Sequence, residues 1–258
     1  MLEHRYPRGL SAAFNHWTSA LSTPISEQLS ERAEKFVSSV LALDLKLAVF
    51  DCDGTLWQHD SGSLFFAWEQ KRGLVPQEAL DWILPRYAAY KETSAIAEEV
   101  MCGDMVTIHH GLDEELLRRE AETFWHEQIH GCIFPEMFKL THALKDRGVD
   151  LWAVSSTNNW VVEVGAEYYG IPREHVLAAE VHVENGKATD RLVRVPSGPD
   201  KKVAINEVIK RRPDAVFGNS VHDLHMLEIA RHPFVIHPNP DLRAIAEERQ
   251  WPIYEPLG

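Results

Sequence analysis

The chain has 258 residues, of which 45% are hydrophobic, enough to form a packed core and to exclude a fully disordered protein. Its 39 acidic and 26 basic residues give a formal charge of −13, and the basic residues are not gathered in one segment, so we expect no nucleic-acid partner. Three cysteines without paired spacing, no secretory leader and no membrane-spanning apolar run predict a cytoplasmic protein with no membrane partner.

The first predicted elements are a helix and a strand. Thr23 can cap a helix over about residues 24–41, because Pro24 suits a first turn and apolar residues follow at helical spacing. A short apolar strand over 45–50 comes next and ends in the run Asp51-Cys52-Asp53-Gly54-Thr55. Two carboxylates are therefore expected at the carboxyl end of a buried strand.

The next segment, 61–131, has helical patterning and no convincing strand. A helix over 136–145 and strands over 149–154, 175–181, 215–217 and 234–236 are predicted after it. This alternation indicates an α/β fold with a Rossmann-like, doubly wound parallel sheet.

The spacing of the first two strands also predicts the domain organisation. Roughly a hundred residues separate them, where a simple crossover needs only about thirty. We therefore expect a core domain built from residues 1–60 and 132–258, and an inserted helical cap domain over 61–131. Such an insert leaves the carboxyl edge of the sheet and can act as a lid there.

Four polar clusters follow apolar runs in the chain. The D-x-D-G-T run at Asp51 is expected by chance at only about the one-in-a-thousand level. A calcium loop of the EF-hand type fits it poorly, since the twelfth position needs Glu and here is Gly62. The other clusters are weak when taken alone: Ser155-Ser156, Lys201-Lys202 and Gly218-Asn219-Ser220-Val221-His222-Asp223.

Together and in this order, the clusters resemble the four signature motifs of the haloacid-dehalogenase-like superfamily, and are similar to its phosphoserine-phosphatase-like branch. The resemblance covers about residues 45–236. It implies that Asp51 is the nucleophile that forms an aspartyl-phosphate and that Asp53 carries the proton. It also implies that Ser155 and the backbone of Ser156 hold the phosphate.

The resemblance further implies a lysine and a magnesium ion at the site. We prefer Lys202 to its neighbour Lys201 because of its spacing to Ile205. Mg²⁺ would be held by Asp51, by the main-chain carbonyl of Asp53, and by Asn219 or Asp223, since this ion prefers oxygen ligands.

The sequence departs from the family pattern at two positions. Many relatives have Asp where this chain has Asn219, which predicts weaker metal binding, and phosphoserine phosphatases usually have Asn in place of His222. Asp60 lies where those enzymes resemble each other in carrying a Glu that meets the substrate's amino group. No Arg for a substrate carboxylate is found at the matching depth of the insert, near Ile96.

The expected function is therefore a magnesium-dependent phosphatase that acts on a small phosphorylated metabolite. A phosphotransferase using the same intermediate and a non-catalytic phosphate- or metal-binding regulator are the alternatives. Carbon–halogen hydrolysis is disfavoured, because that reaction does not need Asp53. The aromatic residues of the insert can bind a choline-like cation, but are also typical of a helical core; they are Trp68, Trp82, Tyr87, Tyr90 and Trp125.

Overall fold

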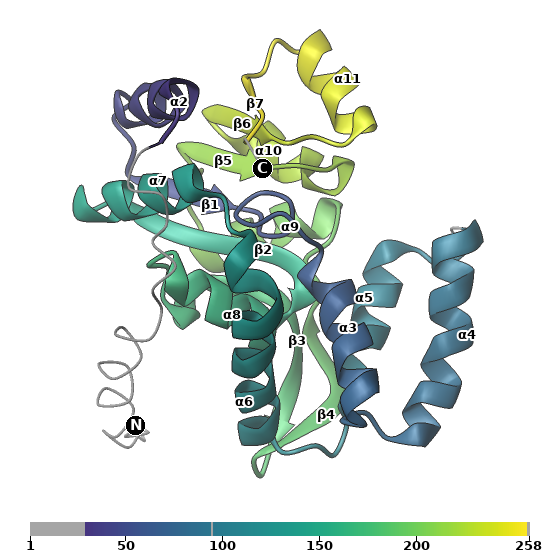
Figure 1. The fold of residues 1–258 in the computed structure, drawn as a ribbon. Helices are drawn as coiled ribbons and strands as arrows, with labels where there is room; N and C mark the ends of the chain where they lie inside the picture. Colours follow the sequence, from purple (N-terminus) through teal and green to yellow (C-terminus); the bar gives the residue numbers. More distant parts are fainter. Residues whose placement is uncertain (1–28, 94, 257–258) are drawn as a thin grey trace.

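The computed structural model describes residues 29–93 and 95–256, and a seven-stranded sheet forms its centre (Figure 1). The strand order is β4-β3-β2-β1-β5-β6-β7, and only β3 and β4 pair in antiparallel fashion. The chain winds outward from β1 in both directions, which confirms the doubly wound α/β prediction. The strands are β1 (Leu47–Phe50), β2 (Asp150–Asn158), β3 (Val176–Glu184), β4 (Lys187–Arg194), β5 (Ala215–Gly218), β6 (His232–Ile236) and β7 (Ile253–Tyr254).

Apolar side chains cover both faces of the sheet, because successive residues of a strand point to opposite sides. In β1, Ala48 and Phe50 belong to one apolar cluster, which includes residues of α2, α7 and α8. Leu47 and Val49 belong to a second cluster with α9, α10 and α11. These core helices are α2 (Glu31–Leu41), α7 (Pro135–Asp146), α8 (Asn159–Tyr168), α9 (Pro199–Ala204), α10 (Leu224–Ile229) and α11 (Pro240–Glu248).

The inserted segment, residues 61–131, is helical throughout its main elements, as its sequence pattern predicts. The helices are α3 (Ser61–Arg72), α4 (Gln77–Thr93), α5 (Glu98–Thr107) and α6 (Glu114–Phe124). Asp60 caps α3 by accepting a hydrogen bond from the Ser63 amide, and Gly73 ends the helix in a left-handed conformation.

Two parts of this insert pack differently. Residues of α3, α4 and α5 form a small apolar cluster of their own, which includes Phe66, Ile83 and Met101. Apolar residues of α6, together with other residues of α3 and α5, belong to the main core cluster, and Arg118 of α6 forms an ion pair with Glu163 of α8 at 2.5 Å. Helices α3, α4 and α5 lie together beside the sheet, and α5 contacts β2, β3 and β4 (Figure 1).

Three elements differ from the sequence predictions. The first described helix begins at Glu31 and is capped by Ser30, so residues 29 and 30 are not helical, and the predicted start at 24 lies outside the described residues. Strand β4 was not predicted. It is joined to β3 by Asn185-Gly186, both with positive φ, a pair typical of a two-residue hairpin turn. Strand β7 also was not predicted.

Candidate active site

Loops at the carboxyl ends of β1, β2 and β5 meet at one edge of the sheet, where the loop before α9 joins them. They bring together Asp51, Ser155, Lys201 and Asn219, which line one cavity of about 350 Å³. Helices α3, α4 and α5 supply the rest of its wall. Among the described residues no helix is both long enough and apolar enough to cross a membrane.

Asp51 follows β1 directly and is buried. Its Oδ1 accepts a hydrogen bond from Nζ of Lys201 at 2.7 Å, and its Oδ2 accepts one from Oγ1 of Thr55 at 2.9 Å. Burial and the charge of Asp223 raise the pKa of Asp51 to about 7, although the Lys201 ammonium lowers it. Asp51 is thus a desolvated carboxylate held by one cation and one hydroxyl.

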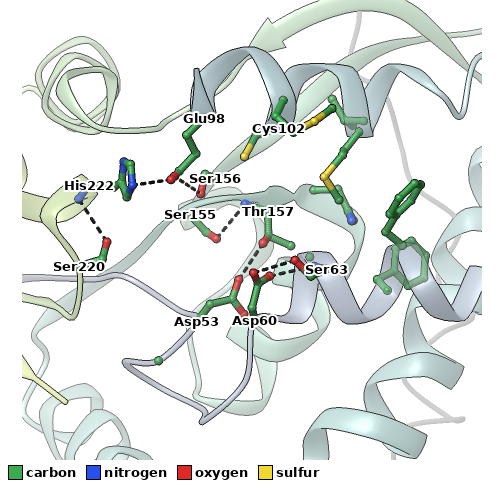
Figure 2. Close-up of a pocket in the computed structure, with 18 of the residues that line it drawn as sticks. Asp53, Asp60, Ser63, Glu98, Cys102, Ser155, Ser156, Thr157, Ser220 and His222 are labelled. Atoms are coloured by element: carbon green, nitrogen blue, oxygen red, sulfur yellow. Dashed lines mark hydrogen bonds and ion pairs between the residues drawn. The ribbon is translucent and has the colours of Figure 1, made fainter. Parts of the chain in front are cut away.

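Asp53 lies two residues further on and is held in a different way (Figure 2). Its Oδ1 accepts hydrogen bonds from Nε1 of Trp57 at 2.6 Å and from the amide of Ser61 at 2.8 Å, and its Oδ2 accepts one from Oγ1 of Thr157 at 2.7 Å. Burial and the charge of Asp60 raise the pKa of Asp53 to about 6, while the bonds from Ser61 and Thr157 lower it. Asp53 can therefore exchange a proton near neutral pH.

The lysine at this site is Lys201, which corrects the preference for Lys202. Lys201 is buried, and its Nζ donates to Asp51 and, at 2.6 Å, to Oδ1 of Asp223. Although burial lowers it, the charges of Asp223 and Asp51 hold the pKa of Lys201 well above its usual range, so the ammonium stays charged. Lys202 is exposed to solvent.

The helical phase of α9 explains why Lys201, and not Lys202, faces the site. Lys201 shares a buried face with Ala204, Ile205 and Ile209, since residues three, four and eight positions apart lie on one side of a helix.

Asn219 and Asp223 come from the loop after β5. Oδ2 of Asp223 accepts hydrogen bonds from the backbone amides of Asn219 at 2.9 Å and Ser220 at 3.0 Å, which leaves Oδ1 to face Lys201. The Asn219 side chain packs on Gly54, where a Cβ atom would lie 1.9 Å from its Nδ2. Gly54 also has a φ of +75°, so this position requires glycine on two counts.

The oxygen donors at this place fit a magnesium ion. The carboxylates of Asp51 and Asp223 both contact the ammonium of Lys201. The side-chain amide of Asn219 lies against Gly54, and the main-chain carbonyl of Asp53 belongs to the loop that contains Gly54. Mg²⁺ takes such hard oxygen ligands. No group of three or more His, Cys, Asp and Glu side chains that could hold a metal occurs in residues 29–93 and 95–256.

The two predicted phosphate-binding serines lie in the irregular end of β2, where its pairing with β3 shifts between Val154 and Asn158. Ser155 is buried, and its Oγ accepts a hydrogen bond from the amide of Thr157 at 3.2 Å. Ser156 instead donates from its Oγ to Glu98, at 3.4 Å. Both serines line the cavity.

Asp60 also lines the cavity, on the side of the inserted helices. Its Oδ1 and Oδ2 accept hydrogen bonds from the backbone amide and the hydroxyl of Ser63, each at 2.8 Å (Figure 2). The predicted substrate residue is therefore also the N-cap of α3.

Several residues at the site were not predicted. Thr55 and Thr157 hold the two aspartates. Thr55 belongs to the D-x-D-G-T run and Thr157 directly follows the Ser155-Ser156 pair, so their position was the available signal. Glu98 and Ser197 gave no signal, because their side chains meet only in the folded chain, at 2.9 Å.

The family model for haloacid dehalogenase-like hydrolases matches residues 48–228. A histidinol-phosphatase of Neisseria meningitidis serogroup C (strain 8013) is 24% identical over 221 residues, which cover 80% of this chain and 97% of that protein. The crystal structure of a protein with unknown function from Bordetella pertussis Tohama I has a TM-score of 0.63 and 25% identity, covering 80% of this chain and 96% of that one. A phosphoserine phosphohydrolase-like protein from Francisella tularensis subsp. tularensis SCHU S4 has a TM-score of 0.56 and 17% identity, covers 81% of this chain and 95% of that one, and shares the fold.

Proposed function

Because this chain belongs to the haloacid dehalogenase-like hydrolase family, we propose that it is a magnesium-dependent phosphatase that cleaves a small phosphomonoester through an aspartyl-phosphate on Asp51. The observation that carries the proposal is the environment of Asp51. This carboxylate lies at a cavity wall, is held by Lys201 and Thr55, and shares the cavity with Asp53 and Ser155. In its ionised form such a carboxylate can attack phosphorus.

The two aspartates divide the chemistry between them. Asp51 attacks the phosphorus atom, and the bond to the alcohol oxygen breaks while protonated Asp53 gives that oxygen its proton. Asp53 then accepts a proton from water, which attacks the phosphorus and releases Asp51 and inorganic phosphate. The pKa of Asp53, raised to about 6 by burial and by Asp60, suits both transfers near neutral pH.

The neighbouring groups hold the phosphoryl oxygens. The Lys201 ammonium is charged and lies 2.7 Å from the nucleophile, so it neutralises charge where the phosphoryl group binds. Ser155 offers its hydroxyl to the same cavity from the end of β2. Mg²⁺ would be held by Asp51, Asn219, Asp223 and the Asp53 carbonyl, and when bound it supplies positive charge beside the nucleophile.

We further propose that the inserted helices act as a cap over the cavity. Residues of α3, α4 and α5 form a small apolar cluster and supply part of the cavity wall, whereas Phe65 and Trp68 of α3, Val106 of α5 and the apolar residues of α6 anchor the insert in the main core. Movement of the part that packs only in the small cluster, which includes α4, would open the cavity with little exposure of the main core.

The direct test is phosphate release from 4-nitrophenyl phosphate by the full chain with Mg²⁺ and with EDTA. The expected result is turnover with Mg²⁺ that EDTA abolishes and added Mg²⁺ restores. Turnover that is equally fast in EDTA would remove the metal from the proposal. No release of phosphate under either condition, with a folded protein, would overturn the phosphatase assignment.

A further inference from the structure

One carboxylate of the inserted helices, that of Glu98 on α5, contacts three segments of the core, and Figure 2 shows two of these contacts, with Ser156 and His222. Its Oε1 accepts hydrogen bonds from Oγ of Ser197 at 2.9 Å and Oγ of Ser156 at 3.4 Å. Its Oε2 lies 2.6 Å from Nε2 of His222, and the side chains of Glu98 and His222 are 16% and 42% exposed. The histidine is thus the partner that water screens more strongly.

The cavity wall near Glu98 carries negative charge without a free cation. Asp60 and Glu98 both line it. Among the described residues that line the cavity, Lys201 is the sole lysine or arginine, and its ammonium is held between Asp51 and Asp223. A second anionic group on a substrate would therefore meet these carboxylates, and the imidazole of His222, which also lines the cavity, is already paired with Glu98.

These charges affect the pKa of Tyr90, which lies on the same wall. Burial and then the charge of Glu98, with a smaller effect of Asp60, raise the pKa of Tyr90 above its usual range. Burial raises the pKa of Glu98, but the hydrogen bond and charge of His222 outweigh it and hold that pKa below its usual value. Glu98 is therefore ionised at neutral pH.

Aromatic rings stand beside these carboxylates. Tyr87 and Tyr90 both line the cavity, with ring centroids 6.3 Å apart and planes tilted by 41°. Phe66 packs edge-on against Tyr87 at 5.0 Å. Ring faces attract ammonium groups, and the effect is larger where water is excluded. The ammonium of Lys91 already lies 5.7 Å from the ring centroid of Tyr87 and 6.0 Å from that of Tyr90, so the carboxylates of Glu98 and Asp60 are the feature of the wall that favours a cation on a substrate.

We propose that Glu98 is a specificity-determining residue that makes the cavity select phosphomonoesters whose alcohol part carries a positive charge, such as aminoalkyl phosphates, and reject those whose alcohol part carries a carboxylate. The proposal rests on the phosphatase activity proposed above. With the phosphoryl group at Asp51, the alcohol part extends toward the wall formed by Glu98, Asp60 and the two tyrosines. A cavity of about 350 Å³ has the size of a site for a small molecule.

The test uses three esters of similar size that differ in charge: phosphoethanolamine, propyl phosphate and phosphoglycolate. The expected kcat/KM decreases in that order, with at least a tenfold difference between the first and the last. Equal values for all three, together with turnover of 4-nitrophenyl phosphate, would overturn the specificity alone. No turnover of any ester, including the aryl phosphate, would overturn the phosphatase assignment and this proposal with it.

Variants of Glu98 separate a specificity role from a structural one. Glu98→Gln keeps the shape of the side chain and is expected to lower the phosphoethanolamine-to-phosphoglycolate ratio of kcat/KM about tenfold, and Glu98→Lys to invert it. The matched control is Glu99→Gln, an exposed neighbour on α5 that is expected to keep the ratio of the unmodified chain. If Glu98→Gln and Glu98→Lys both slow all three esters by one common factor, Glu98 has only a structural role and the proposal is wrong.

Discussion

Replacing the nucleophile with its isosteric amide, Asp51→Asn, should stop turnover and yet stabilise the metal-free protein. Burial and the charge of Asp223 raise the pKa of Asp51 from its ordinary 3.8 to about 7. The folded state then keeps a proton that the unfolded state has lost, so stability falls as the pH rises between these two values. Asparagine removes that penalty, and its amide can still bond to Lys201 and Thr55.

The structure sets the size of the effect. A pKa difference of about three units corresponds to about 4 kcal/mol, at about 1.4 kcal/mol for each unit. We therefore expect Asp51→Asn to raise the free energy of unfolding by about 4 kcal/mol at pH 8.5 and by less than half of that at pH 5. For a chain of this size the gain at pH 8.5 corresponds to a rise in Tm of about 10 °C.

The assay is thermal unfolding in EDTA at the two pH values, beside phosphate release with Mg²⁺. Turnover should fall at least ~1,000-fold. Asp190→Asn, a change at an exposed aspartate of β4, is the control and should leave both the Tm and its pH dependence unchanged. Equal Tm values for Asp51→Asn and the unmodified chain at pH 8.5 would refute the destabilising effect of the buried Asp51 charge. Retained turnover would refute the covalent mechanism.

Three further substitutions test neighbouring groups. Lys201→Met should reduce kcat at least ~100-fold, because it removes the cation at the nucleophile. The control is Lys202→Met, on the exposed side of the same helix, which should change stability and activity little. An equal loss of kcat in both variants would contradict the placement of Lys201. Asn219→Asp should lower the Mg²⁺ concentration needed for half-maximal activity, because it adds a negative charge, and an unchanged titration would show that residue 219 is not a ligand. Thr157→Val removes a hydrogen bond that lowers the pKa of Asp53, so the alkaline limb of the kcat/KM profile should move to higher pH by about half to one unit; a shift to lower pH would contradict Asp53 as the proton donor.

The fold was largely predictable because its parallel strands are buried on both faces and read as continuous apolar runs. Leu47–Phe50 is such a strand, and all four residues are buried. Strand β4 lacks this signal, since most of Lys187–Arg194 is exposed. The Asn185-Gly186 pair before it was a usable hairpin signal. In contrast, Ile253–Tyr254 is only two residues long and is defined by its pairing with β6, which the local sequence does not reveal.

The sequence predicted the site residues that directly follow a strand. It was less informative where the helical phase determines which side chain faces the site. Asp51 directly follows β1, so the strand alone directs it to the sheet edge. Lys201 and Lys202 both lie in α9, and the apolar pattern after them was ambiguous because Val203 and Val208 are apolar and yet exposed. The buried phase follows Ala204 and Ile205 instead, and a π-helical turn over Ile205–Ile209 alters the spacing further on.

Glu98 shows why a sequence predicts the type of reaction more readily than the substrate. Its hydrogen-bond partners Ser156 and Ser197 lie 58 and 99 residues away in the chain, and no local pattern links them. The groups proposed for the reaction all follow strands or start a helix of the core, so any chain with these motifs and this sheet brings them together. The cavity wall proposed to contact the alcohol part of the substrate instead depends on how the inserted helices pack against the core. Proteins that share the motifs can therefore share the chemistry and differ in substrate, and a charge change at the position of Glu98 is a direct way to test that separation.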